Sequence, residues 1–158
     1  MKKLAPDADL RRHLVALLEG GSAHITFADA VKDFPVESAG VRPNKSPHSA
    51  WELLEHLRIA QEDIVLFSES SDYVQPNWPD DYWPASPAPR NAREWTHSVE
   101  SVREDLARFV KLINDGNRDL LEPFPWGNGQ TLLREALLIA DHNAYHLGQL
   151  LLVRRLLE

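Results

Sequence analysis

Residues 140–150 read Ala-Asp-His-Asn-Ala-Tyr-His-Leu-Gly-Gln-Leu and place two histidines four positions apart. The flanking sequence is rich in leucine and contains no proline, which predicts an α-helix. On a helix, His142 and His146 lie one turn apart and about 40° apart around the axis, so both imidazoles face the same way. This geometry is typical of two metal ligands supplied by one helix.

Apolar residues on this helix predict which way the two rings point. One set is expected to mark the buried side: Leu133, Ala136, Leu137, Ala140, Ala144, Leu147 and Leu151. A second set surrounds the histidines: Leu138, Ile139, Tyr145, Leu150 and Val153. The histidine pair should therefore point inward or into a cleft. Buried neutral imidazoles need partners, and one cation satisfies two rings at once.

A metal ion requires a further protein ligand, and His56 is the other histidine in a comparably strong helical pattern. The helix around it carries an apolar stripe formed by Leu53, Leu57, Ala60, Ile64 and Phe67. His56 falls roughly 60° from the centre of that stripe, at the rim of the buried face. We therefore take it as the candidate third ligand.

The other histidines are expected to lie outside such a site. His13 lies among charged residues and His97 lies off the apolar stripe of its helix, so both should face solvent. His24 precedes a short predicted helix, where it could overhang a metal site, but a surface or capping role is favoured. His48 lies eight residues before His56, roughly 80° away around a helix and in its first turn, which makes it a poor ligand.

Two carboxylates lie near His56 on the same predicted helix. Glu52 is one turn before it and Asp63 two turns after it, at nearly the same azimuth. Either could accept the free ring N–H of a ligating histidine, as carboxylates around metal sites often do, or act as a general base. The alternative, that both are simply solvated, is equally compatible with the sequence.

Three further polar residues adjoin the histidine pair. Asp141 is another candidate base, but one residue along a helix turns it about 100° from His142, so it should face water or a neighbouring helix. Tyr145 and Gln149 lie beside the ligands and could shape a substrate pocket. Alternatively, both pack against a partner.

Two motifs together resemble one protein family. Ser-x-Trp-Glu-Leu-Leu-x-His over residues 49–56, followed downstream by Asp-His-x-x-x-His-x-Gly-Gln over residues 141–149, resembles the DinB/YfiT-like superfamily. The resemblance extends from about residue 22 to residue 157. It implies a four-helix bundle that holds a divalent metal on His56, His142 and His146. It also implies a metal-dependent enzyme related to thiol-using transferases and isomerases, and a homodimer formed through helix faces.

The rest of the chain predicts an all-α protein. Long helices are expected at Asp7–Leu18, from Ser46 or Ser49 to about Ser70, at Asn91–Asn114, and from a cap at Thr131 to the end. The first should bury Leu10, Leu14, Leu17 and Leu18. A short extra helix is expected between residues 22 and 34, after a cap at Thr26. The proline- and tryptophan-rich loop around residues 73–90 is either a lid over the site or a cluster packed on one end of the bundle.

Composition limits the classes of function. A length of 158 residues fits one domain, and 43% hydrophobic with 26% charged residues is ordinary for a soluble globular protein. The net charge of −7 argues against nucleic-acid binding, and no apolar run is long enough for a membrane span. Residues 1–7 lack the apolar run of a secretory signal, and cysteine is absent. We therefore expect a cytoplasmic protein with a small-molecule substrate, in which any thiol would come from that substrate.

Three neutral histidines would leave a divalent cation with an open coordination position, which is typical of catalytic sites. Such a cation could activate water, giving a hydrolase, or bind a low-molecular-weight thiol as cosubstrate, giving a thiol transferase. Zinc or nickel is the preferred identity, although iron(II) and copper also suit imidazole ligands. The competing hypothesis is a non-catalytic helical module that binds metal or a protein partner.

Overall fold

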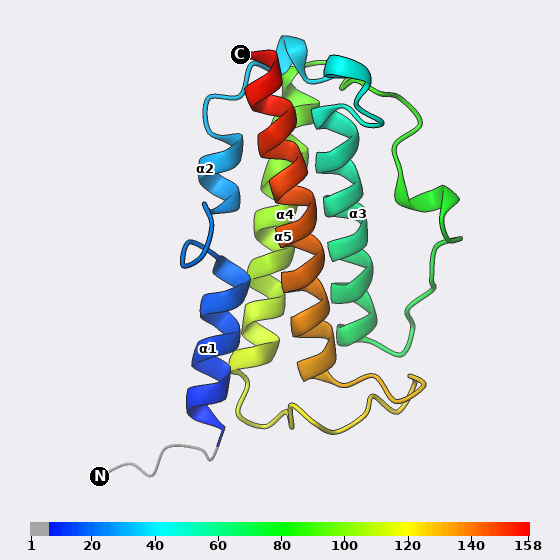
Figure 1. The fold of residues 1–158 in the computed structure, drawn as a ribbon. Helices are drawn as coiled ribbons and strands as arrows, with labels where there is room; N and C mark the ends of the chain where they lie inside the picture. Colours follow the sequence, from blue (N-terminus) through cyan, green and yellow to red (C-terminus); the bar gives the residue numbers. More distant parts are fainter. Residues whose placement is uncertain (1–6) are drawn as a thin grey trace.

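The computed structural model describes residues 7–158, and within this range the chain is helical. Four helices of 12 to 26 residues lie side by side (Figure 1): α1 (Ala8–Glu19), α3 (Ala50–Glu69), α4 (Ala92–Asn114) and α5 (Leu132–Leu157). The short α2 (Phe27–Val31) follows α1, and single 3-10 turns occupy Val36–Ser38, Pro43–Lys45 and Asp80–Tyr82. No strand occurs in the described range, where the sole strand-like contact is an isolated bridge. The predicted all-α fold is confirmed.

The prediction that the chain lacks a secretory signal falls mostly on residues 1–6, which lie outside the described range. Each of the described helices is too short or too polar to cross a membrane.

The helices begin at capping residues. The Ser49 hydroxyl accepts a hydrogen bond from the Glu52 amide at 3.2 Å, and the Glu52 carboxylate accepts one from the Ser49 amide at 2.8 Å. This capping box, rather than the Ser46-Pro47 start, therefore begins α3. Thr26 and Thr131 cap α2 and α5, as predicted, each through a side-chain oxygen that accepts from the backbone amide three residues along. Such caps typically contribute about 1 kcal/mol each.

The buried side of α1 differs from the prediction. Leu14 and Leu18 are buried, but Leu10 and Leu17 are 41% and 52% exposed, and Arg11 is buried in their place. The Arg11 guanidinium donates hydrogen bonds to the carbonyls of Ile113, at 2.5 Å, and of two residues just after α4. A charged side chain becomes acceptable in the interior because it satisfies carbonyls left open at a helix end.

The buried side of α5 was also predicted incorrectly in part. Leu137 is 48% exposed, and the buried face instead comprises Leu132, Glu135, Ala136, Ile139, His146, Leu147, Leu150 and Val153. Leucines occur all around this helix, so their pattern does not single out one stripe. The actual stripe includes His146, which places this histidine directly in the interface with the other helices.

Glu135 is an unusual member of this buried face, and it gives a prediction. Burial raises the pKa of its carboxyl group, and Arg134, with N–O distances of 2.8 and 3.0 Å, offsets this only in part. Because the folded pKa lies above the unfolded one, the folded state binds the proton more tightly and stability falls as the pH rises through the interval between them. We expect Glu135→Gln to stabilise the protein at pH 7 and to have less effect at pH 4, measured by urea unfolding. If Glu135→Gln changed the free energy of unfolding by the same amount at pH 7 and at pH 4, this prediction would be contradicted.

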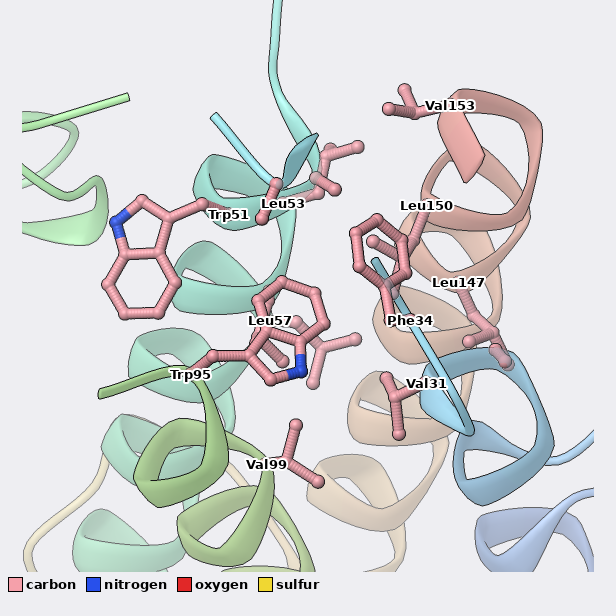
Figure 2. Packing of buried hydrophobic residues seen from close by; sticks show 14 of the residues in the cluster. Val31, Phe34, Trp51, Leu53, Leu57, Trp95, Val99, Leu147, Leu150 and Val153 are labelled. Carbon is pink, nitrogen blue, oxygen red and sulfur yellow. The ribbon is translucent and has the colours of Figure 1, made fainter. Parts of the chain in front are cut away.

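The hydrophobic core forms two clusters, one toward each end of the bundle. Figure 2 shows the cluster formed by the start of α3, the start of α4, the end of α5 and the segment around α2. Aromatic rings contribute to it: Phe34 stacks on Trp95 with 4.6 Å between ring centroids. Its members Leu57 and Leu147 are the immediate neighbours of His56 and His146. The backbone positions that carry these histidines are therefore held by a packed core.

Candidate metal centre

The structure brings three histidine rings from two helices together. His56 comes from α3, and His142 and His146 come from α5. One ring nitrogen of each lies within 4.8 Å of the others, and the Nε2 atoms of His56 and His142 are 3.1 Å apart. The ring centroids are 4.5 to 5.0 Å apart. His56 and His146 are buried and His142 is half-buried, so the centre lies at the edge of the interior.

These distances suit a shared cation. Two nitrogens, each about 2.1 Å from a tetrahedral zinc ion, lie roughly 3.4 Å apart. The 3.1 Å separation between His56 and His142 is of this size, and the third ring lies close by. The three histidines are thus positioned to hold a metal ion.

The protonation states also suit a cation. Burial, together with the neighbouring imidazoles, lowers the pKa of His142 and of His146 to about 4. Burial likewise lowers the pKa of His56, against an opposing effect of its hydrogen bond to the Tyr82 carbonyl. All three rings are therefore neutral at pH 7, and each offers a lone pair, as metal ligation requires.

Amide oxygens determine which nitrogen of two rings carries the proton. His56 Nδ1 donates to the backbone carbonyl of Tyr82 at 2.8 Å, and His146 Nδ1 donates to Gln149 Oε1 at 3.1 Å. Because both partners only accept, each ring keeps its lone pair on Nε2. His142 Nδ1 and Asn143 Oδ1 are the two buried side-chain polar atoms without a hydrogen-bond partner among residues 7–158.

The loop between α3 and α4, residues 70–91, also contacts the centre. Trp83 stacks almost parallel on the His56 ring, with 4.0 Å between centroids and 3° between planes, and it also stacks on His48. Tyr82 is only 4% exposed and supplies the carbonyl that fixes His56. Neither aromatic residue was predicted from the sequence to belong to the site. The available signal was the mixture of aromatics and prolines in an unusually long loop.

The comparison with protein families bears on this arrangement. The sequence model described as the DinB superfamily matches residues 22–150 and so includes all three histidines. The chain belongs to the DinB superfamily. No curated protein and no solved structure matches it. Within the DinB superfamily, this chain combines the predicted helical fold with a buried group of three histidines compatible with metal binding.

The carboxylates predicted to support the histidines have other partners in this DinB-superfamily chain. Glu52 caps α3 and forms an ion pair with Arg42, with 2.9 Å from Nε to its carboxylate. Asp63 accepts hydrogen bonds from the hydroxyl groups of Tyr73 and Tyr82. Neither carboxylate accepts the His56 ring proton, because the Tyr82 carbonyl already occupies that position. A role for Glu52 or Asp63 as a base stays a prediction.

His48 lies closer to the centre than its sequence position suggests. α3 begins at Ala50, so His48 precedes the helix and does not have the position in its first turn that was predicted. It stacks on Trp83 with 4.2 Å between centroids, but it is not one of the three grouped histidines. His13, His24 and His97 are exposed, as expected.

Tyr145 and Gln149 line a cavity of about 420 Å³ beside His146. The Tyr145 ring meets the His146 ring edge-on, with 4.9 Å between centroids. The other lining residues are Ser46, Pro47, His48, Leu53, Trp83, Leu152 and Val153. None of these residues is an aspartate, glutamate, lysine or arginine, so the wall carries no permanent charge. Asp141 is exposed, as predicted from its helical position.

Proposed function

We propose that this protein is a metal-dependent enzyme in which His56, His142 and His146 hold one divalent cation, with zinc or nickel preferred. The observation that carries the proposal is the convergence of three neutral imidazoles, two of which have their Nε2 lone pairs set by amide oxygens. Three neutral ligands leave a coordination position for water or substrate, as in catalytic sites.

The bound cation would supply Lewis-acid chemistry that activates water or a low-molecular-weight thiol cosubstrate. The chain's own residues define the substrate position. Tyr145 and Gln149 form one wall of the cavity beside His146, and Trp83 forms another. The histidine ligands are neutral and the cavity wall carries no charge. The double positive charge of the cation would therefore favour an anionic ligand such as a thiolate or hydroxide. We therefore propose a hydrolase or a thiol S-transferase acting on a small molecule.

Elemental analysis and activity assays test this proposal. Protein purified without a chelating column should carry about one divalent metal per chain, as expected for a three-histidine site. Metal-loaded protein should consume a glutathione-like thiol with an electrophile, or cleave an ester or amide, and the stripped protein should do neither. Thiol consumption identifies a transferase and ester or amide cleavage a hydrolase. A chain that binds no metal would refute the proposal.

The alternative is a non-catalytic helical module that binds metal or a protein partner, and one observation favours a helix-face contact. Leu137, Tyr145, Leu152 and Leu156 are exposed and lie within about a 100° sector of α5. A homodimer through this face would cover them. Light scattering should then give twice the chain mass of 18.0 kDa, and a monomer at high concentration would exclude the homodimer. Metal binding without any metal-dependent turnover would favour the module.

A further inference from the structure

We propose that Asp63 is a positioning residue: its carboxylate attaches the α3–α4 loop to α3 through two tyrosine hydroxyls and thereby fixes the His56 ring. This inference goes beyond the metal site itself, and only its metal-affinity readout rests on the proposed function. It assigns to Asp63 a different role from a base or a direct partner of a histidine.

Tyr82 connects the two ends of this arrangement. Its backbone carbonyl accepts the His56 Nδ1 proton at 2.8 Å, and its hydroxyl donates to Asp63 Oδ2 at 2.6 Å. His56 and Asp63 lie seven residues apart on α3, which corresponds to roughly 10.5 Å along the axis. One loop residue therefore contacts the same helix at two separated points. Attachment of the Tyr82 ring to Asp63 limits where its carbonyl can lie.

The second oxygen of Asp63 is also occupied. Tyr73, from the beginning of the loop, donates its hydroxyl to Oδ1, while Tyr82 occupies Oδ2. Burial and the adjacent carboxylate raise the pKa of Tyr82 to about 12, and the same two causes raise the pKa of Tyr73. Both phenols therefore stay protonated and donate to the carboxylate at neutral pH. Hydrogen bonds to a carboxylate are roughly twice as strong as those between neutral groups.

The consequence for His56 follows from its other contacts. Its Nδ1 proton has the Tyr82 carbonyl as acceptor, which leaves the Nε2 lone pair facing His142 at 3.1 Å. Trp83, the next loop residue, lies flat against the ring with 3° between planes. The same stretch of loop thus sets both the tautomer and the plane of His56. If Asp63 no longer fixes this stretch, both constraints weaken.

Three readouts test the role of Asp63, and two of them need no metal. In metal-free wild-type protein at neutral pH, ¹⁵N NMR should show His56 with its proton on Nδ1. Asp63→Asn keeps the shape of the side chain but offers one acceptor oxygen instead of two, and it should give a mixture of tautomers. The amide of Tyr82, which bonds to the Pro79 carbonyl, should exchange with deuterium at least about tenfold faster. Metal affinity should fall roughly 10–100-fold, the range for residues that orient ligands.

A matched control is available on the same helix. Glu62 precedes Asp63 and pairs with Arg58 at 3.0 Å, so Glu62→Gln makes the same chemical change without touching the loop. It should leave the His56 tautomer and the Tyr82 exchange rate unchanged. If Asp63→Asn unfolds the chain, the Tyr73→Phe and Tyr82→Phe double variant removes the same two hydrogen bonds and should give the same shifts.

The outcomes separate this inference from the proposed function. An unchanged His56 tautomer and an unchanged exchange rate in a folded Asp63→Asn protein would overturn the role of Asp63, even if the protein binds metal. A wild-type protein that binds no metal would refute the proposed function, while the tautomer and exchange measurements would still decide this inference.

Discussion

His142→Ala is expected to lower the affinity of the protein for zinc or nickel by more than the roughly 10–100-fold that loss of an outer partner causes. The substitution removes one of three ligand nitrogens, and the Nε2 atom of His56 loses its neighbour at 3.1 Å. The metal content should fall from about one per chain to near zero. Competition with a chromogenic chelator measures the affinity, and elemental analysis measures the content.

His97→Ala is the matched control, because His97 is exposed on α4 and lies outside the grouped histidines. It should keep the wild-type affinity. His56→Ala, on the other helix, should reproduce the loss seen with His142→Ala. Retention of full affinity by either ligand variant would show that the ion, if present, is bound elsewhere.

Phe109→Ala should reduce the free energy of unfolding by about 3–5 kcal/mol, the usual cost of removing a large buried aromatic ring. Phe109 is fully buried in the cluster between α1, α3, α4 and α5, away from the histidines. Such a loss is a large part of the roughly 5–15 kcal/mol of a typical protein. Urea unfolding of the metal-free protein measures it, so that bound metal does not add to the stability.

Lys111→Ala, two residues along α4 and exposed, provides the comparison and should change the stability by no more than about 0.5 kcal/mol. The metal affinity of a still-folded Phe109→Ala protein should stay within a few-fold of wild type, because the space left by the missing ring lies away from the three histidines. A loss below about 1 kcal/mol would mean that the core closes around the missing ring.

The helices were largely predictable because the sequence features that mark where they begin are local. Ser49, Asn91 and Thr131 cap α3, α4 and α5 through bonds to residues three positions along, and such spacings are visible in the sequence. The same holds for His142 and His146, whose i, i+4 spacing makes them neighbours on any helix. His56 was chosen as the third ligand from its own helical pattern, and the family resemblance then implied the same three histidines.

The features that were not predicted from the sequence depend on contacts between segments that are distant in the chain. Tyr82 reaches His56 across 26 positions through an irregular loop, and no periodicity predicts where such a carbonyl lies. The sequence left the role of Glu52 open, whereas in the structure the capping box and the Arg42 ion pair occupy both of its oxygens. Arg11 entered the core because carbonyls about a hundred residues away needed donors.

The amide oxygens behind His56 and His146 have an electronic consequence. A carboxylate behind a ligating imidazole pushes electron density toward the metal, whereas a neutral oxygen does so much less. Rings supported in this way donate weakly, so an ion among them would remain strongly electrophilic. Small anions such as azide or cyanide should therefore compete effectively for its open position.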